Sequence, residues 1–445
     1  MSIAEPATAR LDLEATHVGS VFVSNYPPYS FWNAESVPAA KEVLARPPEA
    51  GATLGLYLHI PFCRRRCKFC YFRVFIDKNS DEVRDYLDTM AAEVELYSRL
   101  PAVEGRPLRF VYFGGGTPSY ISAKQLAALV TRLKAAIPWD QTEEVAFECE
   151  PGTLTRSKLE VIREIGVTRL SLGVENFNDE ILRENGRAHE SAEIERVRPW
   201  IRELDFRQLN IDLIAGMVGE SWDTWRETVD RAIGYDPESV TLYQMELPFN
   251  TLYSKGVLGG ASAQEFASWS VKREWHAYAF ERLEEAGYEA WSAYTMLKRG
   301  RKPRPRFVYA DAVWHGSDMI GAGVSSFSQM SGVHYQNFDR WHDYLEAAGG
   351  DELPIARAFA TSPQERLTRE LILLMKTGHV ERAYFLDKFG ADVVEIFKEP
   401  LEKLREQGML EIHDDEIRLR REGLLRVDQL LPEFYNPDYR DSRYT

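Results

Sequence analysis

The sequence of 445 residues contains only four cysteines and no run of 18 apolar residues. Without such a run, no segment is long and apolar enough to span a membrane as a helix, and residues 1–14 lack the basic-then-apolar pattern of a secretory signal. So few cysteines argue against a disulfide framework and indicate a reducing compartment. Positive charge is also scarce, because 54 Lys and Arg face 69 Asp and Glu, which disfavours a nucleic-acid partner. We therefore expect a soluble, cytoplasmic protein that binds neither membranes nor nucleic acids.

Three of the four cysteines fall within eight positions, as Cys63-Arg-Arg-Arg-Cys67-Lys-Phe-Cys70, directly after the apolar run 56–62. Three thiolates can hold three irons of a [4Fe–4S] cube and leave the fourth iron free for a ligand. A zinc site normally has a fourth protein ligand, and the nearest histidine, His59, precedes the motif within a strand-like run. Three unrelated thiols or a zinc loop are the alternatives. The spacing predicts that Cys63, Cys67 and Cys70 are metal ligands.

From residue 55 onward a pattern of strand, loop and helix repeats six times. Apolar runs predict strands at 56–60, 110–113, 145–147, 169–174, 209–214 and 240–245, and helical periodicity covers 81–100, 122–137, 156–165, 190–204, 222–233 and 263–286. Short buried strands that alternate with helices predict a parallel sheet covered by helices, which is an α/β fold. Six units are too few for a full eight-stranded barrel.

The length exceeds what one hydrophobic core usually supports, so we expect several domains. We divide the chain into an N-terminal arm (1–54), the βα domain (55–290), an extension that closes it (291–350) and a C-terminal domain (351–445). The extension contains a basic loop, 298–306, with six positive charges in nine residues. This loop is either solvated or a clamp for an anionic substrate or an acidic electron donor. The helix–helix–hairpin order of the last domain is typical of a winged-helix-like fold, which we interpret as a cap over the substrate.

The cysteine motif, with Phe69 before its third cysteine, resembles the signature of radical S-adenosylmethionine (radical SAM) enzymes. The longer string Tyr57-Leu-His-Ile-Pro-Phe-Cys63 resembles the HemN-like branch, typified by oxygen-independent coproporphyrinogen III oxidase, which also contains haem chaperones and some methyltransferases. The resemblance can be followed from about residue 25 to residue 434. It implies a partial (β/α)6 barrel and a [4Fe–4S] cluster on the three cysteines. It also implies that SAM binds the open iron and is cleaved to methionine and a 5′-deoxyadenosyl radical.

The resemblance also implies the residues that bind SAM, which gather beyond the carboxyl ends of the strands. Glycines after the second strand let backbone groups approach a ligand closely and match the family loop that holds the methionyl amino group. Glu175 replaces the glutamine usual in relatives but can still accept from ribose hydroxyls, and Arg187 matches an arginine near the SAM carboxylate, unless it is a surface arginine. The implied SAM contacts are Tyr57, Phe69, Gly114, Gly115, Gly116, Thr117, Glu148, Glu175, Arg187 and Asp212.

Two more strand ends carry candidate residues. Glu148 and Glu150 share one face of the third strand, and Cys149 between them should point into the packing layer as a small core residue. Gln244 and Glu246 follow the sixth strand and are candidates for contact with the substrate. Together with Glu148 they are the candidate catalytic residues.

Three functions follow from the resemblance. The first is oxidation of a porphyrinogen in porphyrin biosynthesis, by oxidative decarboxylation of two propionates of coproporphyrinogen III. Its partners would be an anionic tetrapyrrole substrate and an electron donor such as flavodoxin or ferredoxin, and the aromatic, proline-rich segment 24–32 favours it. The second is a methyltransferase or cyclopropanating enzyme that uses two SAM molecules on a natural product, because Phe72 stands where the oxidases tend to carry a fourth cysteine. The third is a haem chaperone, although Tyr309-Ala310 replaces the usual His-Asn pair.

Overall fold

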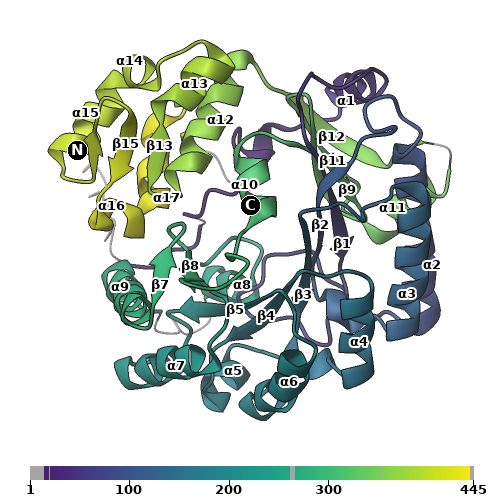
Figure 1. Ribbon diagram of the computed structural model, residues 1–445, viewed down its shortest axis with the longest axis horizontal. Helices are drawn as coiled ribbons and strands as arrows, with labels where there is room; N and C mark the ends of the chain where they lie inside the picture. Colours follow the sequence, from purple (N-terminus) through teal and green to yellow (C-terminus); the bar gives the residue numbers. More distant parts are fainter. Residues whose placement is uncertain (1–14, 20, 261–265, 351, 441–445) are drawn as a thin grey trace, which may run out of the picture.

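A twelve-stranded sheet organises the structure, a computed structural model that describes residues 15–19, 21–260, 266–350 and 352–440 (Figure 1). Its strand order is β12-β11-β10-β9-β1-β2-β3-β4-β5-β6-β8-β7. Six consecutive parallel strands form its centre: β1 (Leu54–Ile60), β2 (Leu108–Gly115), β3 (Glu144–Cys149), β4 (Arg169–Glu175), β5 (Gln208–Ala215) and β6 (Ser239–Gln244). Each corresponds to one predicted strand, so the α/β fold with six parallel strands is confirmed.

Helices cover the outer face of these strands (Figure 1). Six of them were expected: α2 (Ser80–Tyr97), α3 (Ala123–Ala136), α4 (Arg156–Glu164), α6 (Ser191–Glu203), α7 (Trp222–Tyr235) and α9 (Trp269–Glu285). The first three residues of the helix expected at 263–286 lie outside the described residues. Helix α2 shows why these segments are helical. The Asn79 side chain caps its first turn by accepting from the backbone N–H groups of Asp81 and Glu82, and residues at helical spacing, including Val83, Leu87 and Met90, are buried.

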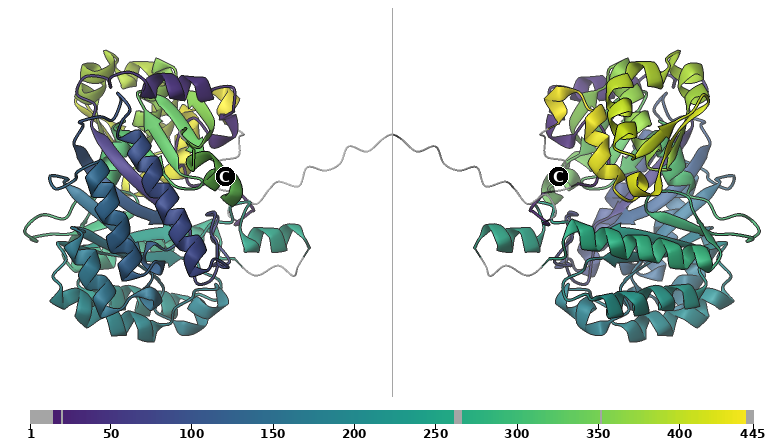
Figure 2. Two further views of the ribbon diagram at one scale, coloured as in Figure 1. Left: turned by 90° about the vertical axis from the view of Figure 1, so that its right-hand side faces the viewer. Right: turned by 90° about the vertical axis from the view of Figure 1, so that its left-hand side faces the viewer.

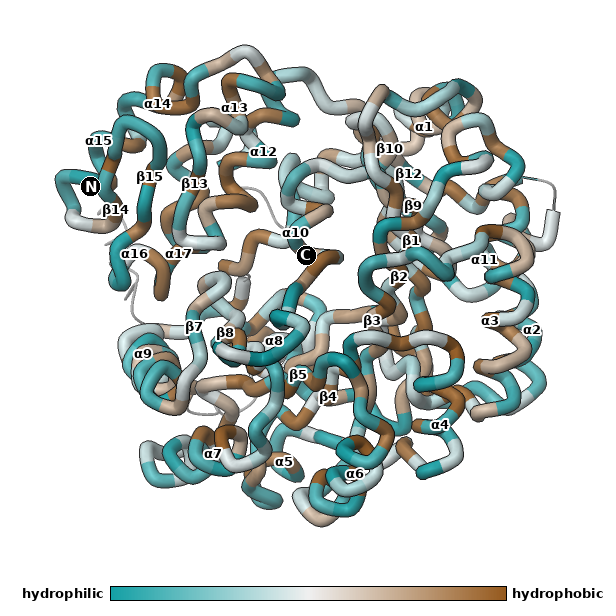
Figure 3. Tube along the Cα trace, viewed as in Figure 1, coloured by the Kyte–Doolittle hydropathy of each residue, from teal (hydrophilic) through white to brown (hydrophobic). Residues whose placement is uncertain are grey.

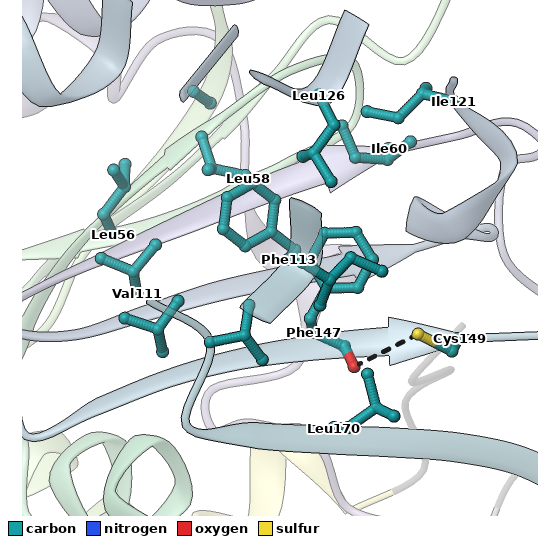
Figure 4. Close-up of a cluster of buried hydrophobic side chains, with 14 of the residues drawn as sticks. Leu56, Leu58, Ile60, Val111, Phe113, Ile121, Leu126, Phe147, Cys149 and Leu170 are labelled. Atoms are coloured by element: carbon teal, nitrogen blue, oxygen red, sulfur yellow. Dashed lines mark hydrogen bonds between the residues drawn. The ribbon is translucent and has the colours of Figure 1, made fainter. Parts of the chain in front are cut away.

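The main core lies between the strands and these helices. Leu58, Val111, Phe113 and Phe147 point from neighbouring strands into one apolar cluster (Figure 4), and brown, hydrophobic segments follow the central strands in Figure 3. Each fully buried side chain of this size contributes about 1.5–3 kcal/mol. Cys149 belongs to the cluster and is 4% exposed, which confirms its predicted place in the core.

Strands that the sequence analysis did not predict widen the sheet at both edges. Strand β9 (Asp318–Ala322) pairs parallel with β1 and leads to β10 (Phe327–Met330), β11 (Val333–Asn337) and β12 (Ile355–Ala360). At the other edge, β8 (Thr295–Lys298) pairs antiparallel with β6 and with β7 (Tyr288–Ala290). The extension after residue 290 therefore contributes strands to both edges of the six-stranded centre.

The C-terminal region contains α12 (Pro363–Met375), α13 (Arg382–Phe389), α14 (Val393–Ile396) and α15 (Lys398–Glu406), and then α16 (Arg421–Leu425) and α17 (Val427–Leu430). Strands β13 (His379–Glu381), β14 (Leu410–Ile412) and β15 (Glu416–Leu419) form a separate antiparallel sheet. Helices followed by a hairpin were expected here. This region has its own core, which Val23 and Tyr26 of the N-terminal arm join. The division of the chain into four domains stays a prediction.

The remaining helices are α1 (Val37–Leu44), α5 (Asp179–Glu184), α8 (Leu252–Leu258), α10 (Val308–Trp314) and α11 (Trp341–Ala348). Short 3-10 turns lie at Tyr29–Phe31, Pro118–Tyr120, Pro151–Thr153, Leu431–Phe434 and Pro437–Tyr439. Helix α8 projects from the body of the molecule (Figure 2). No helix among the described residues is both long and apolar enough to cross a membrane.

Candidate cluster and cofactor site

The three clustered cysteines face a cavity of about 600 Å³. Strand β1 ends at Ile60, and the loop that follows is held at its start by hydrogen bonds from Cys63 N to Phe75 O, 3.1 Å, and from Phe75 N to Pro61 O, 2.8 Å. Cys63, Cys67 and Cys70 all line the cavity. The fold thus brings the predicted metal ligands to one wall of one cavity.

The donor set fits a three-thiolate cluster. Burial raises the pKa of the Cys63 thiol to about 11 and that of Cys70 to about 12, so a strongly charged metal group is needed to hold them as thiolates. Among the described residues, no three His, Cys, Asp or Glu side chains converge as they would on a single ion. A cube bonds each thiolate to a different iron and needs no common point, whereas zinc requires its ligands within about 2.0–2.3 Å of one centre.

The glycine loop after β2 lies against Cys63. Gly116 N donates to Ile60 O at 2.8 Å, and a Cβ at Gly116 would lie 2.9 Å from Phe62 O and 3.1 Å from Cys63 Sγ. Glycine is therefore required where this loop passes the cysteine. Gly115, Gly116 and Thr117 line the cavity, and Thr117 Oγ1 lies 3.3 Å from Cys63 Sγ.

Two of the implied SAM contacts lie outside the cavity lining. A Cβ at Gly114 would meet the rings of Tyr112 and Tyr57 at 2.8 and 3.1 Å, so this glycine allows those rings to pack. Tyr57 stacks on Tyr112 and its Oη lies 3.1 Å from His59 Nδ1. Phe69 does line the cavity. Tyr57 and Gly114 thus pack beside the cavity wall, and their assignment as SAM contacts stays a prediction.

Three half-buried carboxyl groups line the cavity from consecutive strands: Glu148 on β3, Glu175 on β4 and Asp212 on β5. Burial raises the pKa of Glu148 and of Glu175 to about 7 and that of Asp212 to about 6. Tyr112 Oη donates to Glu148 at 2.6 Å. Two donors fix Asp212, namely Ser171 Oγ at 3.0 Å and Asn210 Nδ2 at 2.9 Å. The cavity therefore contains acids that titrate near neutral pH.

Arg187 connects the end of β4 to the cysteine loop. Its Nη2 donates to Gly173 O at 2.7 Å and lies 3.5 Å from Glu175 Oε1, while Nη1 donates to Cys67 Sγ at 3.4 Å. Glu175 has φ of +63°, in the left-handed region, which turns its side chain toward the arginine. The Arg187 side chain is 12% exposed, so the interpretation as a surface arginine is wrong.

A second anchor of the loop, Arg64, has no role in the sequence analysis. It donates to both carboxylate oxygens of Glu150, from Nε at 3.0 Å and from Nη2 at 2.8 Å. Although burial acts to raise the pKa of Glu150, hydrogen bonds from His189 and Arg64 lower it to about 2. Glu150 therefore stays ionised and ties the end of β3 to the cysteine motif. The sequence does show an arginine within the motif and a carboxylate after the third strand. Periodicity, however, cannot predict that two residues 86 positions apart are in contact.

Gln244 and Glu246 line the cavity beyond β6. Glu246 accepts from the backbone of the N-terminal arm, from Phe22 N at 2.9 Å and from Val21 N at 3.3 Å. Gln244 Nε2 donates to Leu425 O at 3.3 Å, and its buried Oε1 has no hydrogen-bond partner among the described residues. Glu246 therefore joins the arm to the end of β6 beside the cavity, and Gln244 joins β6 to the C-terminal region.

The arm, the C-terminal region and an aromatic wall complete the cavity. Residues 21–24 and 424–429 line it, and Trp291 stacks between Phe307 and Trp314 with ring centroids 5.4 and 5.2 Å apart. Phe72, 43% exposed, stacks on Tyr71 at another part of the lining. No histidine is among the described residues of this lining.

The basic loop 298–306 does not form part of this site. None of its described residues lines the cavity, and its cations pair with carboxylates elsewhere, as in Arg301 with Asp236 at 2.6 Å and Arg306 with Glu143 at 3.1 Å. The structure supports the interpretation as a solvated loop and not the one as a substrate clamp.

Comparisons with known proteins agree with the site. A family model for the radical SAM superfamily matches residues 57–232, and one for the HemN C-terminal domain matches residues 361–426. Fold and site together define a radical SAM protein. Its relatives include the heme chaperone HemW of Bacillus subtilis, 26% identical over 85% of this chain and 98% of the relative. Another is the oxygen-independent coproporphyrinogen III oxidase of Pseudomonas aeruginosa, 27% identical over 89% of each chain. This chain belongs to the HemN-like branch of the radical SAM superfamily.

The solved structure of coproporphyrinogen III oxidase (HemN) from Escherichia coli has the same fold. It matches with a TM-score of 0.79 at 22% identity, over 93% of this chain and 96% of the other. Membership of the superfamily implies a [4Fe–4S] cluster and SAM as cofactors, in agreement with the three thiols on the cavity wall.

Proposed function

We propose that this protein is a radical SAM oxidoreductase that acts on a porphyrinogen-type tetrapyrrole, by oxidative decarboxylation of coproporphyrinogen III. The observation that carries the proposal is the single cavity of about 600 Å³ that begins at the three thiols and extends to the aromatic wall and the C-terminal region. This volume lies within the range of small-molecule sites, roughly 300–1,000 Å³. A relative named for this activity matches over 89% of each chain.

The cavity offers a carboxylate where a porphyrinogen offers N–H donors, since Glu148 lines it at the end of β3. A reduced tetrapyrrole has four pyrrole N–H groups that can donate to this carboxylate, and its pyrrole rings suit the wall formed by Trp291 and its stacked neighbours. Complementarity of this kind favours a tetrapyrrole over a substrate with acceptors alone.

When bound, the cluster and SAM supply the 5′-deoxyadenosyl radical that takes a hydrogen atom from the substrate. The work of this chain is to hold and orient both groups. Cys63, Cys67 and Cys70 hold the cluster, backbone groups of 115–117 receive the methionyl amino end, and Arg187 receives the SAM carboxylate. Asp212 would accept from the ribose hydroxyls, and Glu175 lies beside Arg187.

Residues that close the cavity keep water from the radical. The arm segment 21–24 and the segment 424–429 lie over the site, and Glu246 binds the arm through two backbone N–H groups. Glu148, with its pKa raised to about 7 by burial, can give or take a proton at neutral pH.

A haem chaperone is the second candidate, because HemW of Bacillus subtilis matches over 98% of its own length. Haem normally needs an axial ligand such as histidine. The described lining of the cavity contains no histidine, and Tyr309 and Ala310 stand in place of the His-Asn pair usual in the chaperones. The absence of a histidine from this described lining and of the His-Asn pair favours the oxidoreductase over a haem chaperone.

The test is an anaerobic assay of the reconstituted protein with SAM, a reductant, a one-electron acceptor and coproporphyrinogen III. We expect protoporphyrinogen, carbon dioxide and 5′-deoxyadenosine. Cleavage of SAM with the porphyrinogen unchanged would contradict the proposal. Formation of S-adenosylhomocysteine would instead identify a methyltransferase that uses two SAM molecules, and a stable Soret shift on haem titration without turnover would identify a chaperone.

A further inference from the structure

A second cavity, of about 530 Å³, lies against the other side of the cysteine loop. Its lining includes residues from the end of α5 and the start of α6, two helices that lie at the bottom of Figure 1. Four arginines dominate it, and its complete lining is Arg64, Arg65, Arg183, Arg187, Ala188, His189, Glu190, Ala192 and Glu193. Arg64, Arg65, Arg187 and Ala188 also line the main cavity. The second cavity, called the outer cavity below, therefore adjoins the main cavity at these four residues.

The three arginines inside the cysteine motif are used differently. Arg64 is bound to Glu150, and Arg66 Nη2 donates to Cys70 O at 3.3 Å and to Asn250 O at 3.0 Å. Arg65 is exposed and makes no hydrogen bond or ion pair with any residue that the structure describes. Two arginines therefore shape the loop, while the third presents its charge to the solvent between two cluster ligands.

The other charges around the outer cavity are balanced within the protein. Arg64 lies 2.8 Å from Glu150, Arg183 lies 3.1 Å from Glu190 and Arg187 lies 3.5 Å from Glu175. Of the four arginines that line the outer cavity, Arg65 is therefore the one that forms no ion pair with a described carboxylate. The chain has a net charge of −15, so its surface repels acidic proteins in general. A local positive charge such as that of Arg65 therefore determines where an acidic protein can approach.

We propose that the outer cavity is the docking point of an acidic one-electron carrier protein of the flavodoxin or ferredoxin class, with Arg65 as a contact residue. The proposal rests on the cluster of the proposed function but not on its substrate. A protein donor is far too large to enter the main cavity of about 600 Å³. At the outer cavity, by contrast, the donor reaches Arg187, whose Nη1 lies 3.4 Å from Cys67 Sγ.

Charge reversal at Arg65 is a clean test because it breaks no contact of the described residues. The holoprotein is compared with Arg65→Glu, Arg65→Lys and the control Arg207→Glu. Arg207 is likewise exposed and without a described partner, but it precedes β5 and so lies at the opposite end of the strands from the cysteine loop. Cluster reduction by flavodoxin hydroquinone is followed by stopped-flow absorbance. Photoexcited 5-deazaflavin, a small uncharged reductant, serves as the reference.

We expect Arg65→Glu to slow reduction by flavodoxin by about tenfold at low salt, with a smaller effect at high salt. Arg65→Lys and Arg207→Glu should stay close to the wild-type rate, and all four proteins should react equally with deazaflavin. Direct titration with oxidised flavodoxin should show weaker binding for Arg65→Glu alone, whether or not the cluster is present.

A wild-type rate for Arg65→Glu with flavodoxin would overturn the proposal, as would an equal loss in Arg207→Glu. An equal loss with deazaflavin would also overturn it, because that result means a damaged loop. The proposed function fails separately, when a cluster reduced by deazaflavin cleaves SAM but leaves coproporphyrinogen III unchanged.

Discussion

At the scale of single residues, the site depends on a few groups that join the cysteine loop to strand ends. Arg187 connects β4 to Cys67, and Arg64 connects β3 to the motif through Glu150. The sequence identifies Arg187 through the resemblance, but the partner of Arg64 becomes visible only in three dimensions. Side chains from distant segments meet here because parallel strands end at one edge of the sheet.

The cysteine assignment predicts different outcomes for two serine variants. Cys63→Ser should remove the brown colour of the reconstituted protein, because it deletes a cluster ligand. Cys149→Ser should keep the colour, since that thiol packs in the core at 4% exposure, and should cost about 1–3 kcal/mol of stability through the buried hydroxyl. Anaerobic iron and sulfide analysis should give about four of each per chain in the wild type. Full colour in Cys63→Ser would refute the assignment.

Glu175 should make SAM binding depend on pH. Burial raises the pKa of this carboxyl to about 7, so it ionises between pH 6 and 8. In the ionised form it pairs with Arg187, 3.5 Å away, and competes with the SAM carboxylate for that arginine. Glu175→Gln cannot ionise. The ratio of wild-type to variant Kd for SAM should therefore rise by up to about tenfold from pH 6 to pH 8. Equilibrium dialysis at several pH values measures it, and a constant ratio would contradict the competition.

At the scale of elements, hydrophobic periodicity was sufficient for the six central strands and their helices because each has a continuous buried face. It failed for β7 to β12. These strands are short, and β11 (Val333–Asn337) is buried along its whole length while containing His334, Gln336 and Asn337. Polar residues in a buried strand give no apolar signal, so only the pairing partners reveal it.

The N-terminal arm should loosen when its anchor on the barrel is weakened. Glu246 accepts from Phe22 N and Val21 N, and Glu246→Gln removes one acceptor and the charge. The loss of about 1–2 kcal/mol of local stability should speed hydrogen exchange of the Phe22 amide by about 5- to 30-fold. Peptides from α2 should exchange as in the wild type. Unchanged exchange at residues 21–24 would show that the arm is held by its other contacts alone.

At the scale of the whole molecule, buried carboxyl groups give folding stability a definite dependence on pH. Burial raises the pKa of Glu93 and Glu148 to about 7 and that of Glu220 to about 8. Since these folded-state values exceed the unfolded ones, the folded protein binds more protons than the unfolded chain above about pH 4.5. Their contribution to stability is complete below the unfolded pKa and is lost as the pH rises through the folded pKa. The contribution of these carboxyl groups to the free energy of unfolding should thus decrease from pH 5 to pH 8.

Glu93 is the member of this group that can be tested away from the cofactor site. It is fully buried on α2 and accepts from Gly323 N at 2.9 Å, Asn337 Nδ2 at 2.6 Å and Tyr344 Oη at 2.7 Å, so it joins α2 to the edge strands. A pKa raised from 4.5 to about 7 corresponds to a pH-dependent cost on the order of 3 kcal/mol.

Urea unfolding of the cluster-free protein at pH 5, 6, 7 and 8 measures this cost. Glu93→Gln should lower stability at pH 5, where it exchanges a protonated acid for an amide with fewer acceptors, and should be less destabilising at pH 8, where the wild type must hold a buried charge. The exposed residue Glu104 provides the matched control, because in Glu104→Gln the free energy of unfolding should change with pH as it does in the wild type. If the free energy of unfolding depends on pH as steeply in Glu93→Gln as in the wild type, the proton taken up on folding resides on other carboxyl groups. The site carboxylates Glu148 and Glu175 then become the source of the pH dependence.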